Sequence, residues 1–227
     1  FLCSIHCLRG TACLIRMALY FCARRSTLEI AMTVFARRAL LLLLIVPLLS
    51  AGLIKSSLAN ESRTGWEHLE APRTLAIMRH AIAPGTGDPE EFRIGDCATQ
   101  RNLDGTGRAQ ARLIGNAVRA AGVEVDRILS SQWCRCLETA ELLGLGATEE
   151  LASLNSFFAD RSTEAKQTEE LRAFLAALPD DERVILVTHQ VNITALTGVY
   201  PASGEVILFR IEADGAVTVL ERIRTQA

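Results

Sequence analysis

The sequence predicts an α/β fold, namely a three-layer α/β/α sandwich whose mostly parallel sheet carries a C-terminal hairpin. Short apolar runs suited to buried strands alternate with amphipathic stretches suited to helices. Such alternation packs as a sheet with helices on both faces. Near the end of the chain, Asp214-Gly215 separates two strand-like runs at residues 205–211 and 216–223, which is a hairpin signal.

The first half of the predicted domain begins with an apolar run at residues 74–78, which is suited to a buried strand. Residues 60–73 before it are polar and predict a linker. Proline and glycine predict a loop at residues 84–89. A helix is expected at residues 105–121, because four apolar residues recur there at helical spacing: Ala109, Leu113, Ala117 and Val118.

The second half repeats this alternation. Residues 125–129 predict a strand and residues 134–143 a helix with one apolar face. Residues 163–178 predict an amphipathic helix, which a proline ends. The apolar run at residues 184–187 predicts a buried strand, and residues 191–197 predict a short helix.

The N-terminal region differs in composition from the rest of the chain. Residues 32–59 combine a short basic start, an apolar run and small residues before Ala59, which is the layout of a secretory signal peptide. Because Met32 begins a complete signal, we expect residues 1–31 to be a non-native upstream extension. The protein is thus predicted to be exported to the periplasm. The alternatives are an uncleaved membrane anchor and a cytosolic protein with an apolar first helix.

The charge balance excludes one class of partner. From residue 60 onward the chain carries 17 basic against 25 acidic residues, and aromatic residues make up only 5% of the whole chain. Nucleic-acid binding needs a basic surface, and single strands need aromatic stacking platforms. We therefore expect no nucleic-acid partner, and contact with a membrane only through an uncleaved signal.

Two histidines and two arginines stand at the ends of predicted strands. Arg79 and His80 close the first strand, and His189 closes the strand that begins at Val184. Arg135 follows the second strand, at the start of a predicted helix. Ligands of open α/β sheets bind beyond the carboxyl ends of the strands, so these side chains would meet in one crevice if their strands are neighbours.

This set of side chains suits phosphoryl transfer. Guanidinium groups bind phosphate oxygens through paired hydrogen bonds, and a helix N-terminus adds backbone donors. A neutral imidazole is a competent nucleophile, and the neighbouring arginines disfavour protonation of His80. The pattern therefore predicts transfer through a phosphohistidine, without a metal or another cofactor.

The sequence resembles the histidine phosphatase superfamily, which is related to phosphoglycerate mutases. The resemblance covers residues 74–211, within a catalytic domain expected at 74–227, and the exported branch fits the N-terminal signal. Four short segments carry it in the family's order: Arg79-His80, the glycine-containing turn at 102–110, the segment from Ser130 to Ala140 around Arg135, and Thr188-His189.

The resemblance implies that His80 takes the phosphoryl group, that Arg79, Arg135 and His189 bind its oxygens, and that water then releases phosphate. The substrate would be a phosphorylated small molecule or a phosphorylated envelope sugar. A phosphoglycerate mutase-like phosphotransferase and a non-catalytic binder of phosphorylated envelope components are the alternatives.

The general acid is where the sequence departs from many family members. No carboxylate adjoins the late histidine; Gln190 and Asn192 stand there and are expected to bind substrate as neutral hydrogen-bond donors. Asp160 is the preferred candidate, because two phenylalanines precede it and an apolar wall would raise its pKa. Asp88 and Asp96, in the loop after His80, are further candidates.

Three cysteines lie in the predicted domain. Cys97 could form a disulfide with Cys134 or with Cys136 in an oxidising compartment, which would tie the loop after the first strand to the Arg135 segment. Three buried thiols are the alternative. The spacing of the cysteines does not suit zinc, so no metal site is expected.

Overall fold

The computed structural model describes residues 65–225. The expected extension at 1–31 and the expected signal at 32–59 lie outside the described residues. The strands of the described residues are β1 (Thr74–Arg79), β2 (Arg127–Ser130), β3 (Thr148–Glu150), β4 (Val184–Thr188), β5 (Val206–Ile211) and β6 (Val217–Ile223). The helices are α2 (Gly105–Ala120), α3 (Cys134–Leu143), α4 (Glu164–Ala176) and α5 (Gln190–Thr197), with 3-10 turns η1 (Trp66–Glu70), η2 (Cys97–Thr99), η3 (Ala152–Leu154) and η4 (Arg161–Thr163).

The strands form one mixed sheet in the order β3-β2-β4-β1-β5-β6. The pairs β3–β2, β2–β4 and β4–β1 are parallel, whereas β5 runs antiparallel to β1 and to β6. The predicted α/β fold with a mostly parallel sheet and a C-terminal hairpin is therefore confirmed. The strand β3 was not predicted, because its sequence Thr-Glu-Glu carries no apolar pattern.

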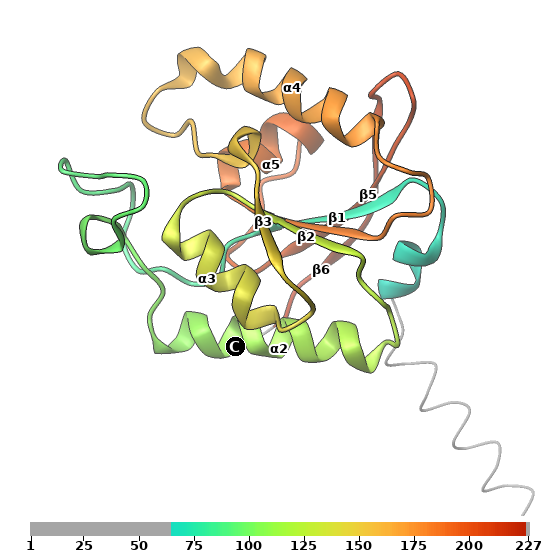
Figure 1. The fold of residues 1–227 in the computed structure, drawn as a ribbon, viewed down its shortest axis with the longest axis horizontal. Coiled ribbons are helices and arrows are strands. Elements are labelled where there is room, and N and C mark those ends of the chain that lie inside the picture. Colours follow the sequence, from blue (N-terminus) through green and yellow to red (C-terminus); the bar gives the residue numbers. More distant parts are fainter. Residues whose placement is uncertain (1–64, 226–227) are drawn as a thin grey trace, which may run out of the picture. The chain divides into compact units, whose positions relative to one another are not determined.

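Helices cover both faces of the sheet, with α2 and α3 on one side and α4 and α5 on the other (Figure 1). Alternate residues of β1 serve the two cores. Ala76 and Met78 pack with α2 and α3, while Leu75 and Ile77 pack with α4 and α5. A strand buried on both faces explains why β1 reads as a continuous apolar run instead of an alternating one.

The buried face of α2 shares only Val118 with the predicted one. Ala109 and Leu113 are exposed, and the helix instead buries a face that contains Gly107 and Gly115. A Cβ atom at either glycine would lie 1.9 Å from a carbonyl oxygen, that of Ile82 or that of Leu143. The helix backbone therefore packs directly against its neighbours at these two glycines.

The expected linker is also partly wrong. Within residues 60–73, the segment η1 buries Trp66 and Leu69 in the same core as α2 and α3. Two apolar side chains in a polar segment were enough to dock it, although they are too few to show a helical period.

Candidate functional site

Parallel pairing of β1 and β4 brings the two histidines together. Arg79 and Thr188 are register partners at the carboxyl ends of these strands, and the next residues are His80 and His189. The backbone N–H of His80 donates to the carbonyl of Thr188 at 2.9 Å. As a result, the two imidazole rings lie 5.6 Å apart between centroids and are both buried.

Three guanidinium groups line the same cavity as the histidines. Arg79 comes from the end of β1, Arg135 from the first turn of α3, and Arg101 from the loop before α2. Arg101 was not among the predicted site residues, although it directly precedes the glycine-containing turn that the sequence singles out. The backbone carbonyls of Ala83 and Gly87 accept its hydrogen bonds.

The hydrogen bonds of His80 fix which ring nitrogen is free. Its Nδ1 lies 2.7 Å from the carbonyl oxygen of Ala81, which can only accept, so Nδ1 carries the proton. The lone pair is then on Nε2. Burial, followed by the charge of Arg135, lowers the pKa of His80 well below its usual range. The ring is thus neutral near pH 7 and holds an unshared electron pair, which a nucleophile requires.

His189 has the opposite tautomer. Its Nδ1 faces the Nη2 of Arg135 at 3.4 Å, and a guanidinium can only donate. Nε2 therefore carries the proton and donates to the Oγ of Ser131 at 2.9 Å, which in turn donates to Asn155 Oδ1. Burial, and then Arg135, lower the pKa of His189 well below its usual range.

Two buried donors in the site have no partner. The Nε atoms of Arg79 and Arg135 are both enclosed and make no hydrogen bond. Leaving a buried charged donor unpaired is costly, so the two atoms call for an acceptor from outside the chain. An oxyanion with several oxygens, such as a phosphoryl group, would satisfy both.

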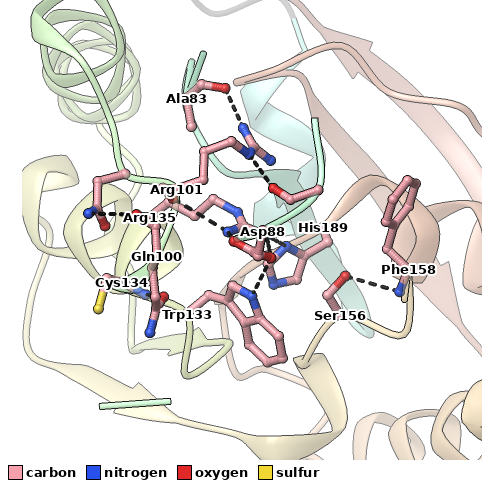
Figure 2. A network of polar contacts seen from close by, with 12 residues as sticks. Ala83, Asp88, Gln100, Arg101, Trp133, Cys134, Arg135, Ser156, Phe158 and His189 are labelled. Carbon is pink, nitrogen blue, oxygen red and sulfur yellow. Dashed lines mark hydrogen bonds and ion pairs between the residues drawn. The ribbon is translucent and has the colours of Figure 1, made fainter. Parts of the chain in front are cut away.

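One carboxylate lies among these cations. Asp88 accepts hydrogen bonds from both terminal nitrogens of Arg135, at 2.5 and 3.1 Å, and from the indole Nε1 of Trp133 at 3.0 Å (Figure 2). Burial opposes ionisation of Asp88, but the hydrogen bond and the charge of Arg135 outweigh it and hold its pKa below the usual value. Asp88 is therefore ionised near neutral pH.

A disulfide supports the start of α3. Cys97 is bonded to Cys134, which confirms one of the two expected pairings, and Cys136 is a free, buried thiol. Burial raises the pKa of Cys136 to about 12, so it stays protonated. The backbone N–H of Cys134 also donates to the side chain of Gln100 at 2.9 Å. These contacts join the loop after β1 to the helix turn that carries Arg135.

Known proteins share this sequence pattern and fold. Residues 75–157 match the family model described as the histidine phosphatase superfamily (branch 1). The matched segment comprises 83 of the 227 residues. The matched segment contains His80, Arg101 and Arg135 and ends before His189.

Solved structures share the fold of the described residues. One is the protein histidine phosphatase SixA in complex with tungstate, with 19% identity, a TM-score of 0.51, and coverage of 66% of this chain and 96% of the other. Another is a putative phosphohistidine phosphatase SixA from Nakamurella multipartitia, with 22% identity, a TM-score of 0.51, and coverage of 69% and 98%. At these identities the likeness establishes the fold. No curated protein sequence matches the chain.

The structure brings together most of the predicted site residues, but not all. The cavity is lined by Arg79, His80, Arg135, His189 and Gln190, all of which were predicted. Asn192 does not line it; this side chain is buried and donates to the carbonyl of Asn155. It follows Gln190 by two residues on a helix, so the two side chains point to different sides.

Asp160 is not placed as expected. It is exposed, lies outside the cavity lining and caps η4, where its carboxylate accepts from the N–H of Ser162 at 2.9 Å. Hydrogen bonding to Ser162 lowers its pKa, so the expectation of a raised pKa was wrong. Of the neighbouring phenylalanines only Phe157 is buried. Asp96 likewise caps a 3-10 turn, and Asp88 is the one candidate that reaches the cavity.

Two further features concern the described part of the chain. Within residues 65–225, no helix combines the length and apolar character that crossing a membrane requires. The same stretch of chain contains no group of three or more His, Cys, Asp or Glu side chains arranged to hold a metal ion.

Proposed function

We propose that the protein is an exported, metal-independent phosphatase that hydrolyses phosphomonoesters through a phosphohistidine on His80. The observation that carries this proposal is the state of His80. Its Nδ1–H is held by a carbonyl, its Nε2 keeps the lone pair, and it shares a cavity with Arg79 and Arg135, whose buried Nε atoms lack acceptors.

The reaction follows from these groups. The lone pair of His80 Nε2 attacks phosphorus, a P–N bond forms, and the P–O bond to the leaving alcohol breaks with its electron pair on oxygen. Guanidinium groups stabilise the charge on the remaining phosphoryl oxygens. The leaving oxygen takes a proton from solvent. Water then attacks phosphorus and releases a proton to solvent, the P–N bond breaks, and the electron pair returns to Nε2. Orthophosphate and a neutral His80 result, so no cofactor is consumed.

The nearest alternative is a non-catalytic binder of phosphorylated envelope components. It is favoured by one observation, namely that the only carboxylate lining the cavity of the described residues is Asp88, which is ion-paired with Arg135 instead of holding a proton. A phosphoglycerate mutase-like phosphotransferase is the enzymatic alternative, and it would return the phosphoryl group to substrate instead of to water.

Export is part of the proposal. It is supported by the signal-like pattern of residues 32–59 and by the Cys97–Cys134 disulfide, because disulfides persist mainly in oxidising compartments. Fractionation of cells that express the chain tests it. We expect the protein in the periplasmic fraction, shortened after Ala59, with one thiol-reactive cysteine after denaturation. Recovery of unshortened protein in the cytosol would contradict the proposal.

The experiment that tests the activity compares wild type, His80→Ala and the matched control His68→Ala. His68 lies in η1, away from the cavity. We expect phosphate release from p-nitrophenyl phosphate by wild type and by His68→Ala, also in EDTA, and no release by His80→Ala. A ³²P label from substrate should be trapped on wild type in an acid-labile form. Tight phosphate binding without a trapped label would favour the binder, and label transfer to phosphoglycerate would favour the mutase.

A further inference from the structure

The guanidinium of Arg135 is already occupied by an anion from the chain itself. Two carboxylate oxygens of Asp88 face the two terminal nitrogens of Arg135, and both side chains are largely enclosed, with 18% and 3% of their surfaces exposed. This paired arrangement is the one by which an arginine binds two oxygens of a phosphoryl group. Asp88 therefore sits where an oxyanion ligand of Arg135 would sit.

We propose that Asp88 is an internal competitor of the substrate: its carboxylate holds the paired donors of Arg135 while the site is empty, leaves when a phosphoryl group binds there, and returns as phosphate departs. The inference rests on the proposed function, since it takes the cavity to be a phosphoryl site. It assigns Asp88 to setting anion affinity and product release instead of to proton donation.

Charge makes simultaneous occupancy unfavourable. If a phosphoryl dianion used the donors of Arg135 while Asp88 stayed, two anions would face each other in an enclosed site, where like charges repel more strongly than in water. Arg79 and Arg101 line the same cavity and remain to bind the phosphoryl oxygens during the exchange. The exchange thus trades one carboxylate for one phosphoryl group on Arg135 and leaves the other cations in place.

The loop that carries Asp88 suits such an exchange. Asp88 lies in an irregular segment after β1, and its neighbours Gly85 and Gly87 adopt left-handed backbone conformations, with φ of +94° and +69°. Arg101 holds the base of this loop through the carbonyls of Ala83 and Gly87. Beyond that anchor, Asp88 accepts side-chain hydrogen bonds from Arg135 and Trp133.

The first test measures binding of inorganic phosphate to the full chain by calorimetry, for wild type, Asp88→Asn and Asp126→Asn. Asp126 forms a similar paired contact with Arg183 at the surface, outside the cavity, and is the matched control. We expect Asp88→Asn to bind phosphate about tenfold more tightly than wild type, because phosphate no longer has to displace a carboxylate from Arg135 before it binds. Asp126→Asn should bind as wild type does. Unchanged or weaker binding by Asp88→Asn would mean that Asp88 only positions Arg135, and it overturns the proposal.

The second test detects the departure of Asp88 directly. The indole N–H of Trp133 donates to Asp88, so release of the carboxylate should change Trp133 fluorescence during a phosphate titration. The chain has two tryptophans, and Trp133→Phe identifies the signal. We expect a saturable change in wild type and none in Asp88→Asn. If wild type binds phosphate without a change in Trp133 fluorescence, the proposed role of Asp88 is overturned, whereas the phosphoryl site itself is not. Absence of phosphate binding in every variant instead refutes the phosphoryl site itself, and the proposed function with it.

Discussion

His80 and His189 are separated by 109 residues in the chain, yet their ring centroids lie 5.6 Å apart, because the strands that precede them are parallel neighbours in register. The two rings have opposite tautomers. His80 keeps its lone pair on Nε2. In His189 the Nε2 carries the proton and donates a hydrogen bond to the Oγ of Ser131. The pair is therefore asymmetric, with one ring free to attack and the other fixed by hydrogen bonds on both sides.

Replacement of Arg135 by lysine should impair catalysis strongly. Lysine keeps the charge but cannot form the paired hydrogen bonds of a guanidinium. We expect kcat/KM for p-nitrophenyl phosphate to fall by about 100-fold, in line with the loss of one transition-state donor pair. Arg127→Lys, which alters a surface ion pair with Glu149, is the control and should leave kcat/KM within about twofold. Equal kcat/KM values for Arg135→Lys and Arg127→Lys would show that Arg135 does not take part in catalysis.

Stability should fall as the pH drops below about 6.5. Burial, together with Arg135, lowers the pKa of both histidines below the ordinary value of 6.5. As the pH falls, the unfolded chain therefore takes up protons before the folded protein does. The free energy of unfolding is then fully retained above pH 6.5 and decreases below it, by up to about 1.4 kcal/mol per pH unit for each histidine.

Urea unfolding between pH 7.5 and 5 measures this dependence. The variant His189→Asn should show a shallower loss over the same range, because one of the two groups no longer titrates. A free energy of unfolding for wild type that stays constant or rises toward pH 5 would show that the histidines are not held neutral.

The disulfide between Cys97 and Cys134 should stabilise the protein. Cys97 and Cys134 close a loop with a sequence separation of 37, and a crosslink of that size contributes about 2–4 kcal/mol. Reductant should lower the midpoint of urea unfolding for wild type accordingly. The variant Cys97→Ser/Cys134→Ser should start at the lower midpoint and be insensitive to reductant. Equal midpoints for wild type with and without reductant would contradict this account.

Gly115→Ala should destabilise the fold, because the added Cβ would lie 1.9 Å from the carbonyl oxygen of Leu143. Since backbone must shift to relieve the overlap, we expect a loss above about 2 kcal/mol in the free energy of unfolding. Gly105→Ala is the matched control on the same helix, since a Cβ there would meet nothing within 4 Å. Thermal unfolding measures the stability of both variants. If Gly105→Ala loses as much free energy of unfolding as Gly115→Ala does, the packing argument is refuted.

Aryl phosphates should be better substrates than alkyl phosphates. No protonated carboxylate lines the cavity of the described residues, so the leaving oxygen departs without a donated proton, and phenols leave as anions more readily than alcohols. Phe158 and Tyr200 line the cavity with 52% and 71% of their surfaces exposed, which offers apolar contact to a ring. We expect kcat/KM for phenyl phosphate to exceed that for glycerol phosphate by at least about tenfold. Comparable values would indicate a proton donor.

The sequence alone was sufficient for the order and type of most elements and for five residues that line the cavity, namely Arg79, His80, Arg135, His189 and Gln190. Strong apolar runs predicted β1 and β4, and the residues directly after them predicted His80 and His189, since strand ends in an α/β sheet face the ligand side. Arg79 and Arg135 followed from the same positional logic. The signals were local, because each depended on a few consecutive residues.

Tertiary structure alone decided the contacts between distant segments. The pairing of β1 with β4 joined the histidines, and the loop after β1 brought Asp88 onto Arg135 and Arg101 into the cavity. Asp160 was wrongly predicted as the general acid, because its phenylalanine neighbours do not shield it from solvent. Local patterns report which face of an element is apolar, but which charged side chains share an enclosed space depends on how the elements pack, and packing fixes the pKa values and the free lone pair on which the chemistry rests.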